Sequence, residues 1–338
     1  MNVILLFGGV SEEYEISLRS AAAVLGAIPA HHSVFPIAID REGGWYLTAP
    51  DPAAIASDGW QADAEPVLLD PGRHALLVGG RPLPADAVLP ILHGGLGEGG
   101  GIAALLTLLG LPYVGCPPTA GALGMDKLLT KQAAERCGLR TAAYQTVTRE
   151  MLPDPALPDR LGRALGYPMF VKPTALGSSV GASRVDSPAG LLPALTDALA
   201  YGEVALCEEY IEGCEVELAL LERGDELLGA LVGEIDPGAP FYDYSAKYRD
   251  RRSRIFIPAR LPKAIREEIA SAGRLVFRAL GCRGLARVDF FVRGDEVFFN
   301  EINTMPGFTE VSMFPRLMAA AGIPLGDVVE ILLKSAHL

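Results

Sequence analysis

The chain has 338 residues, half of them apolar, which favours an α/β protein of two or three domains over a disordered or fibrous chain. Its 29 basic and 41 acidic residues give a net charge of −12, which argues against nucleic acid or an anionic membrane as a partner. No apolar run reaches spanning length or resembles a signal peptide, and the five cysteines are scattered without a CxxC pair, so we expect reduced thiols in a cytoplasmic protein rather than a zinc site or disulfides.

Residues 1–117 are predicted to form a first domain in which strands and helices alternate around a parallel sheet. Apolar runs that stop at glycine indicate strands, and an apolar period of three to four residues indicates helices. Residues 44–80 are predicted to form hairpins, because Asp-Pro-Gly at positions 70–72 is typical of a turn. The expected strands are residues 2–9, 31–39, 87–95 and 112–115, and the expected helices are residues 15–28 and 101–110.

The rest of the chain is predicted to form two further units, residues 118–205 and residues 206–338. The first has helices around two strands, with a glycine-containing loop between the strands. The second has two strands with an acidic connection, a polar aromatic loop, a long helix and a hairpin at residues 285–303. The expected helices are residues 126–138, 188–202 and 263–281, and the expected strands are residues 169–173, 178–186 and two within 204–222.

The hairpin carries an unusual set of charged side chains. Arg287 and Asp289 share one face of its first strand, and Glu301 and Asn303 share a face of its second. All four lie among aromatic and aliphatic residues, where an unpartnered charge is costly. Three of them offer the oxygen donors that suit Mg²⁺ held partly by a substrate's phosphates. A structural ion pair between Asp289 and Arg287 explains the pattern equally well, so the hairpin alone does not decide.

Two lysines and a glycine loop suggest a phosphate site. Lys172 ends an apolar strand, and residues 177–179 follow it as Gly-Ser-Ser, whose N–H groups and hydroxyls can close over phosphate oxygens. Lys127 offers a second cation. The segment CEEYIEGCE at residues 207–215 has the form of a nucleotide hinge. For any one of these elements alone, an ordinary solvated charge would be the better interpretation.

Taken together and in this order, the segments resemble the ATP-grasp superfamily and, within it, the D-alanine–D-alanine ligase family. The resemblance covers nearly the whole chain. The segments that carry it are FGGVSEEYEISLRSA, HGGLGEGG, GCPPTAGALGMDKLLTK, YPMFVKPTALGSSVG, EEYIEGCEVELALL, FYDYSAKY, GCRGLARVDFF and NEINTMPGFTEVSMFP.

The resemblance implies an α/β fold of the α+β ATP-grasp type: a Rossmann-like N-terminal domain followed by two ATP-grasp subdomains. It implies ATP as a substrate, two Mg²⁺ ions (or Mn²⁺), and D-alanine as the small-molecule substrate. A homodimer through the first domain is usual for such ligases. ATP would phosphorylate the carboxylate of one D-alanine, and the amine of a second would attack the acylphosphate. The segment FYDYSAKY would be a lid that excludes water.

The resemblance also implies roles for individual residues. The implied metal ligands are Asp289, Glu301 and Asn303. The implied ATP-binding residues are Lys127, Lys172, Ser179, Glu208, Glu209, Ile211, Glu215 and Phe299. The implied catalytic residues are Glu15, which would receive the ammonium group of the first substrate, Ser178, Tyr248, Arg287 and Gly307. The implied substrate-binding residues are His93, Lys247, Ser312 and Met313.

The second substrate is less well specified. Relatives that make the D-alanine–D-lactate ester carry histidine near Tyr248, and relatives that prefer D-serine tend to carry arginine near Met313. Tyrosine and methionine here favour a D-alanyl-D-alanine product. The chain departs from the family pattern at Gly99, which replaces an acidic residue, and at Glu310 and Val311 before Ser312. A ligase that joins D-alanine to D-serine or to another amino acid, in resistance or secondary metabolism, therefore stays open.

Two other classes of protein fit less well. GLGEGG at residues 95–100 matches the dinucleotide-binding spacing, but no acidic residue follows about 20 positions later, as that fingerprint requires. A non-catalytic ATP-binding protein would have lost residues such as Asp289, Glu301, Lys172 or Arg287, and all four are present.

Overall fold

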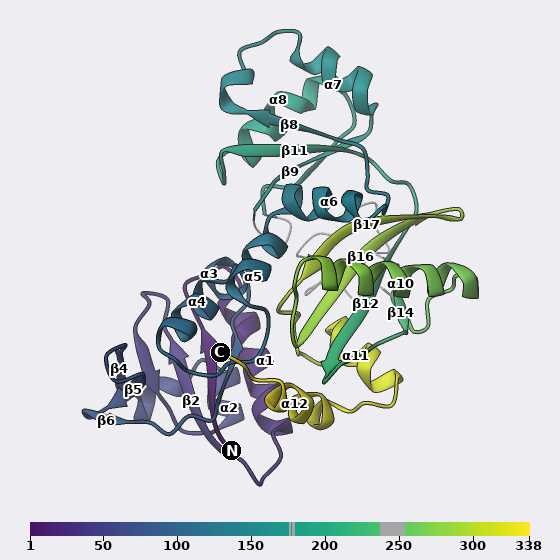
Figure 1. The fold of residues 1–338 in the computed structure, drawn as a ribbon. Helices are drawn as coiled ribbons and strands as arrows, with labels where there is room; N and C mark the ends of the chain where they lie inside the picture. The colour runs from purple at the N-terminus through teal and green to yellow at the C-terminus, as the bar shows by residue number, and fades with distance from the viewer. Residues whose placement is uncertain (176, 178–179, 237–253) are drawn as a thin grey trace.

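The structure is a computed structural model, and it describes residues 1–175, 177, 180–236 and 254–338. Three β-sheets follow one another along the chain, each with helices packed against it (Figure 1). Among the described residues, no helix combines the length and the apolar character that crossing a membrane requires.

The first sheet has seven strands in the order β6-β5-β4-β3-β2-β1-β7, and β1 pairs in parallel with both β2 and β7. The predicted parallel core is therefore confirmed, and the hairpins predicted for residues 44–80 are β3 to β5. The strands are β1 (Asn2–Gly8), β2 (Ser33–Ile39), β3 (Trp45–Leu47), β4 (Glu65–Asp70), β5 (Ala75–Val78), β6 (Arg81–Pro82) and β7 (Ala87–Ile91).

Both predicted helices of this region are present, and two short helices were not foreseen within the hairpin region. The strand predicted at residues 112–115 is reduced to single bridges from Tyr113 to Val88 and His337. The helices are α1 (Tyr14–Ala27), α2 (Pro52–Ala56), η1 (Trp60–Asp63), α3 (Gly95–Glu98) and α4 (Gly101–Leu108).

The second sheet is antiparallel, with the order β10-β9-β11-β8. The predicted boundary between residues 205 and 206 falls inside β11, all of which pairs in this sheet, so we propose a boundary after Glu209. The strands are β8 (Tyr144–Thr148), β9 (Met169–Pro173), β10 (Ser183–Val185) and β11 (Val204–Glu209), and the helices are α5 (Pro118–Met125), α6 (Lys127–Arg136), η2 (Arg149–Met151), α7 (Leu157–Leu165) and α8 (Pro188–Ala198).

The third sheet has the order β15-β14-β12-β16-β17, with β13 paired to β12. The predicted hairpin is confirmed as β16 and β17, and the predicted long helix is α10. The strands are β12 (Cys214–Arg223), β13 (Glu226–Leu228), β14 (Val232–Asp236), β15 (Arg254–Phe256), β16 (Leu285–Arg293) and β17 (Glu296–Asn303), and the helices are α10 (Lys263–Ala279), α11 (Met313–Ala320) and α12 (Leu325–Lys334).

The end of the chain returns to the first sheet. Helix α12 packs against α1, and Figure 1 shows the C-terminus beside the purple first lobe. One apolar core joins Val24 of α1, Leu332 of α12 and Leu221 of β12. The third sheet is thereby fixed to α1, whose N-terminal end borders the site described below.

The turn after β1 depends on a glycine. Gly8 has φ +86°, and a Cβ there would lie 2.2 Å from the carbonyl oxygen of Ile39. Only glycine adopts this conformation without strain, and the neighbouring strand leaves no room for a side chain. The approach of the chain to helix α1 is fixed by this close contact.

We predict that Gly8→Ala lowers the free energy of unfolding by at least about 2 kcal/mol, because left-handed strain and a backbone clash add together. Gly26→Ala is the matched control, since nothing lies within 4 Å of a Cβ on this residue of α1. It should be neutral or stabilise by up to about 1 kcal/mol. Urea unfolding measures both variants, and an equal effect of the two would contradict this account.

Candidate active site

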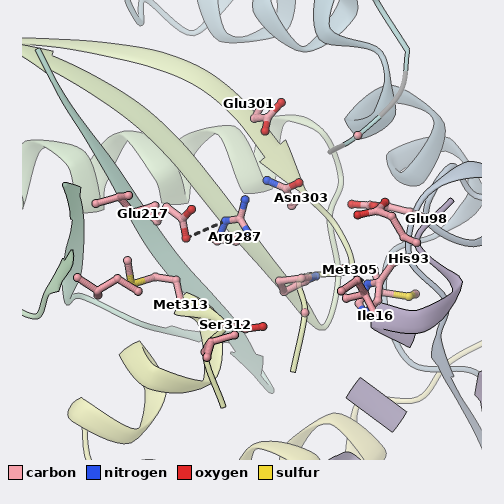
Figure 2. A pocket seen from close by; sticks show the side chains of 17 residues that line it. Ile16, His93, Glu98, Glu217, Arg287, Glu301, Asn303, Met305, Ser312 and Met313 are labelled. Atoms are coloured by element: carbon pink, nitrogen blue, oxygen red, sulfur yellow. Dashed lines mark hydrogen bonds and ion pairs between the residues drawn. The ribbon is translucent and has the colours of Figure 1, made fainter. Parts of the chain in front are cut away.

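A cavity lies where the first and third sheets meet, and residues from both line it (Figure 2). From the first sheet's side come the start of α1 and the loop after β7. From the other side come strands β12, β16 and β17 and the loop that leads into α11. Its lining includes Glu13, Ile16, His93, Glu98, Gly177, Glu217, Arg287, Glu301, Asn303, Gly307, Ser312 and Met313.

The hairpin brings its charged residues together as predicted. Asp289 lies opposite Glu301 and Arg287 opposite Asn303 in the β16–β17 ladder. Arg287 donates from Nη2 to Asp289 Oδ2 at 2.7 Å and from Nε to Oδ1 at 2.8 Å. Asn303 Nδ2 also donates to Asp289 Oδ2, at 3.0 Å. The structure therefore contains the Arg287–Asp289 pair that the sequence left open beside metal binding.

A second buried acid holds Arg287 from the neighbouring strand. Glu217 of β12 lies with Oε2 3.1 Å from Arg287 Nε, and its side chain is 4 % exposed. Burial alone would lower the pKa of Arg287, but the charges of Asp289 and Glu217 outweigh it and raise that pKa well above its ordinary value. The guanidinium is a permanent cation that faces the cavity. Glu217 was not predicted, although its spacing of two from Glu215 places both on one face of β12.

Two buried lysines share one carboxylate. Glu208 at the end of β11 lies 2.7 Å from Lys131 Nζ and 2.7 Å from Lys172 Nζ. Burial alone would raise the pKa of Glu208, but the two lysines hold it below its ordinary value. Burial lowers the pKa of Lys131. Glu208 thus fixes the position of Lys172.

Lys131 is a residue that the sequence reasoning missed. It lies four positions after Lys127 on α6, so the two share one face of that helix. This helical spacing is the signal that could have identified it. Lys127 itself lies 3.5 Å from Glu301 Oε2, which places a cation beside the hairpin.

The structure corrects the prediction for Glu15. That side chain is 54 % exposed and pairs with Arg41, away from the cavity. Glu13 lines the cavity instead, and a Cβ on Gly94 or on Gly177 would lie 2.6 or 3.3 Å from its Oε2. Glu13 lies one turn before Ile16, which also lines the cavity, whereas Glu15 points to another side of α1. That helical period is the signal that distinguishes the two.

The loop from Met305 to Ser312 is tied to the first sheet through His93. The imidazole contacts Met305 O through Nδ1 at 3.0 Å and Ser20 Oγ through Nε2 at 3.0 Å. The same hydroxyl accepts from Phe308 N–H at 3.2 Å. Burial lowers the pKa of His93, so the imidazole is neutral at pH 7. His93 therefore positions this loop across the cavity.

The same loop carries two of the predicted residues. A Cβ on Gly307 would lie 2.8 Å from Ser312 Oγ, so the main chain of Gly307 and that hydroxyl are neighbours. Ser312 Oγ is also 2.8 Å from Thr309 Oγ1. Both Gly307 and Ser312 line the cavity. Ser20 was not predicted.

Glu98 is a further carboxyl that the sequence reasoning missed. Burial and then the nearby charge of Glu13 raise the pKa of Glu98 to about 7. Two carboxyls that face one cavity repel when both are ionised. A cation placed between them would relieve that repulsion. The cavity is therefore suited to an ammonium group at this end.

The predicted hinge residues differ in where they lie. Ile211 is buried beside Phe298 and Ala142, and Glu209 accepts from Ala143 N–H at 3.0 Å. Glu215 is the second residue of β12.

Phe299 is buried behind the third sheet and packs edge-on against Phe290, with ring centroids 5.9 Å apart. A register shift between Asp289 and Phe290 changes the alternation of the hairpin there. The structure therefore does not bring the ring of Phe299 to the face that carries Arg287 and Asp289. Four predicted residues lie outside the described residues: Ser178, Ser179, Lys247 and Tyr248.

The sequence matches two family models along nearly its whole length. Residues 2–116 match "D-ala D-ala ligase N-terminus", and residues 133–334 match "D-ala D-ala ligase C-terminus". The D-alanine–D-alanine ligase of Chlorobium phaeovibrioides is 42% identical over 356 residues, which cover 99% of this chain and 97% of the relative. That of Deinococcus radiodurans is 41% identical over 340 residues, covering 99% and 98%.

Solved structures of similar proteins also align over the full chain. The VanG D-Ala:D-Ser ligase of Enterococcus faecalis aligns with a TM-score of 0.89 at 33% identity and covers 99% of each chain. The D-alanine–D-alanine ligase of Coxiella burnetii aligns with a TM-score of 0.86 at 30% identity, covering 99% of this chain and 95% of that one. These matches confirm the predicted α/β fold of the ATP-grasp type.

We predict that Glu98 makes stability depend on pH. A carboxyl whose pKa rises from 4.5 in the unfolded chain to about 7 in the fold stabilises the fold below pH 4.5, and this contribution is lost as pH rises through 7. The free energy of unfolding should fall by roughly 2 kcal/mol between pH 5 and pH 8. This is less than the pKa shift alone would give, because Glu98 is partly open to the cavity and solvent screens its charge.

Urea unfolding at both pH values measures this loss. Glu98→Gln, which carries no titrating proton, should flatten the pH dependence by that amount. The same decrease in wild type and variant would contradict the assignment, since other titrating groups are common to both proteins.

Proposed function

The chain belongs to the D-alanine–D-alanine ligase family, and from this we propose that it is an ATP-dependent ligase that joins two molecules of D-alanine. The supporting observation is that relatives named D-alanine–D-alanine ligase match over nearly the full length of the chain. In addition, Arg287 faces the cavity, and two carboxylates hold its charge there. The product would be D-alanyl-D-alanine, for peptidoglycan synthesis.

The proposed reaction has two steps, formation of an acylphosphate and formation of the peptide bond. A carboxylate oxygen of the first D-alanine attacks the γ-phosphorus of ATP, so that an acylphosphate forms and ADP leaves. The amine of the second D-alanine then attacks the acyl carbon, and the new C–N bond gives a tetrahedral intermediate. This intermediate loses the proton of the attacking nitrogen and expels phosphate as its C–O bond to the phosphate breaks. Both steps move negative charge, so cations must surround the reacting groups.

We assign Lys172 and Lys127 to the ATP phosphates. Lys172 is held by Glu208, and Lys127 lies beside Glu301. Nucleotide phosphates would compete with these carboxylates for the ammonium groups. A lysine already fixed in position loses little side-chain entropy when it contacts a phosphate.

Asp289, Glu301 and Asn303 fit Mg²⁺ by the chemistry of their donors. Asp289 and Glu301 face each other across the ladder, and Asn303 carries an amide oxygen on the same strand as Glu301. All three offer hard oxygen ligands, which Mg²⁺ prefers. Bound there, Mg²⁺ would neutralise charge on the transferred phosphoryl group. Arg287 and Lys127 balance the two carboxylates in the structure.

Glu13 and Glu98 are the groups that we assign to the ammonium of the first D-alanine. Glu13 takes the role that the resemblance implied for Glu15. Bringing an ammonium group between Glu13 and Glu98 lowers the pKa of Glu98 from about 7, because a nearby cation favours the ionised carboxylate. His93 keeps the Met305–Ser312 loop in place beside them.

Arg287 and the N–H of Gly307 are assigned to the oxyanion of the tetrahedral intermediate. Both line the cavity, and a permanent cation there stabilises charge that develops only during the reaction. We keep the roles that the resemblance implies for Lys247, Ser178 and Tyr248, and we keep FYDYSAKY as the lid. We also propose that the protein is cytoplasmic and forms a homodimer.

Ser312 and Met313 border the place of the second substrate. Met313 and Ile235 form an apolar wall, which suits a methyl group better than a hydroxyl. The D-Ala:D-Ser ligase VanG aligns with this chain at 33% identity, so D-serine is the second candidate. A pocket discriminates such a pair by only about 1–3 kcal/mol.

We predict that Glu13→Gln lowers kcat/KM for D-alanine roughly ten- to hundredfold, because one charge-assisted hydrogen bond to the ammonium is weakened. Glu15→Gln is the matched control two residues away and should change kcat/KM by less than about twofold, since exposed ion pairs contribute little. Steady-state kinetics with varied D-alanine measures both. A larger loss in Glu15→Gln would restore the original assignment.

We further predict that the enzyme releases phosphate from ATP with D-alanine alone and that the product has the mass of D-alanyl-D-alanine. When D-serine is added at the same concentration as D-alanine, D-alanyl-D-alanine should still be the main product. A mixed dipeptide as the main product would favour the second candidate, and no phosphate release with any D-amino acid would contradict the proposed reaction.

A further inference from the structure

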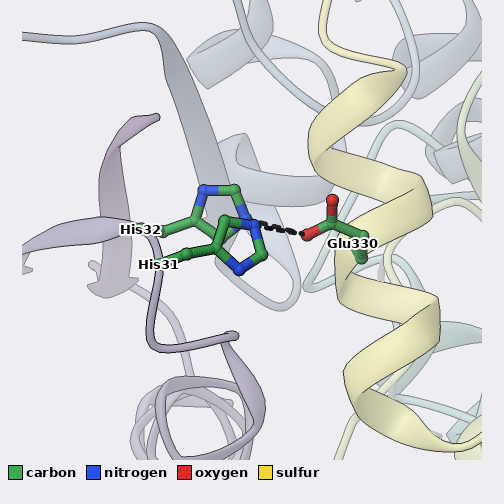
Figure 3. A group of neighbouring side chains, drawn as sticks. All are labelled: His31, His32 and Glu330. Carbon is green, nitrogen blue, oxygen red and sulfur yellow. Dashed lines mark hydrogen bonds and ion pairs between the residues drawn. The ribbon is translucent and has the colours of Figure 1, made fainter.

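Two histidines and a glutamate converge far from the cavity (Figure 3). His31 and His32 lie in the turn between α1 and β2, and Glu330 lies on α12. The centroids of the two imidazole rings are 4.1 Å apart, and their planes are tilted by 40°. Figure 3 shows both rings turned toward the carboxylate of Glu330. Residues about 300 positions apart in sequence thus present three ligand atoms within 4.8 Å of one another.

Two of the three separations between ligand atoms are close to those of a tetrahedral metal site. His32 Nε2 is 2.8 Å from Glu330 Oε2, and His31 Nε2 is 3.6 Å from the same atom. A tetrahedral ion with bonds of about 2.0–2.1 Å holds its ligand atoms roughly 3.4 Å apart. The two measured separations bracket this value. A cation could therefore enter with only small adjustments of the side chains.

A simple ion pair explains one histidine but not both. His32 is buried and hydrogen-bonded to Glu330, which is ordinary. The ring of His31 is 65 % exposed and could turn to water, yet its Nε2 faces the same carboxylate oxygen. Lys334 contacts the other oxygen, Oε1, at 2.9 Å and so orients the carboxylate while leaving Oε2 to the histidines.

We propose that His31, His32 and Glu330 bind a divalent transition-metal ion, with Zn²⁺ the best match. Two imidazoles and one carboxylate are borderline ligands that select Zn²⁺, Co²⁺ or Ni²⁺, whereas Mg²⁺ takes oxygen ligands. The exposed side of His31 leaves a fourth position open to water. The site does not depend on the proposed ligase reaction.

The ion would fasten the C-terminal helix to the first domain. Helix α12 already packs on α1 through Val328 and Leu332. The histidines follow the far end of α1, whose 14 residues span about 21 Å from the cavity end. A contact at that distance does not touch the reacting groups. Because the ion would bind only the folded form, we expect it to raise the stability of the protein.

The test uses the full-length protein without an affinity tag, stripped with EDTA and then kept in excess Mg²⁺ to occupy the oxygen-ligand site. Zn²⁺ is titrated by calorimetry, and thermal unfolding is followed with and without Zn²⁺. Wild type should bind one Zn²⁺ per chain, and its Tm should rise by a few degrees. Co²⁺ should give the visible absorption bands of a tetrahedral site.

The variants separate this site from others. His31→Gln changes an exposed ring and should weaken Zn²⁺ binding at least about tenfold and abolish the Tm rise, as should Glu330→Gln. His74→Asn removes another exposed histidine at φ +51°, a conformation that asparagine accepts, and should behave like wild type. No Zn²⁺ binding by wild type, or equal binding by His31→Gln, would overturn the proposal.

Discussion

The structure of the site depends on the neutralisation of one half-buried guanidinium, that of Arg287. Arg287 lies on β16, between β12 and β17. Its guanidinium pairs with Glu217 of β12 and with Asp289 of its own strand, and Asn303 of β17 donates to Asp289. Unpaired, any of these charges would be expensive to bury. Pairing these groups therefore constrains the register of the three strands, together with the apolar face behind them.

The carboxylates around the proposed metal and phosphate positions are paired with cations before any substrate binds. Asp289 is paired with Arg287, Glu301 with Lys127, and Glu208 with Lys172 and Lys131. Metal ions and nucleotide phosphates would exchange with these internal partners rather than bring uncompensated charge into the protein. Because these charged side chains are already oriented, little reorganisation is needed when the metal ions and phosphates bind.

The alternation of side chains, a local signal, predicted the hairpin and its charged faces, whereas the ATP-grasp fold was implied by the resemblance of the ordered motifs to a known family. The assignment to Glu15 instead of Glu13 was wrong: the two acids flank Tyr14 at the start of α1, and only the helical period relative to Ile16 separates them. Sequence reasoning missed Glu217, Glu98 and Lys131, whose importance arises from partners distant in sequence. It placed Phe299 at the nucleotide, but a register shift in the ladder turns that ring into the core. Local patterns locate elements, whereas bulges and long-range pairing decide which side chains meet.

The central claim is that Asp289 exchanges its internal cation for Mg²⁺ when nucleotide binds. The most direct measurement is the Mg²⁺ dependence of turnover at saturating ATP in wild type and in Asp289→Asn, which keeps the hydrogen-bonding shape but loses the charge. The account predicts that the variant needs at least about tenfold more Mg²⁺ for half-maximal rate, because one charged ligand is lost. An unchanged Mg²⁺ requirement with normal turnover would show that Asp289 serves only to hold Arg287.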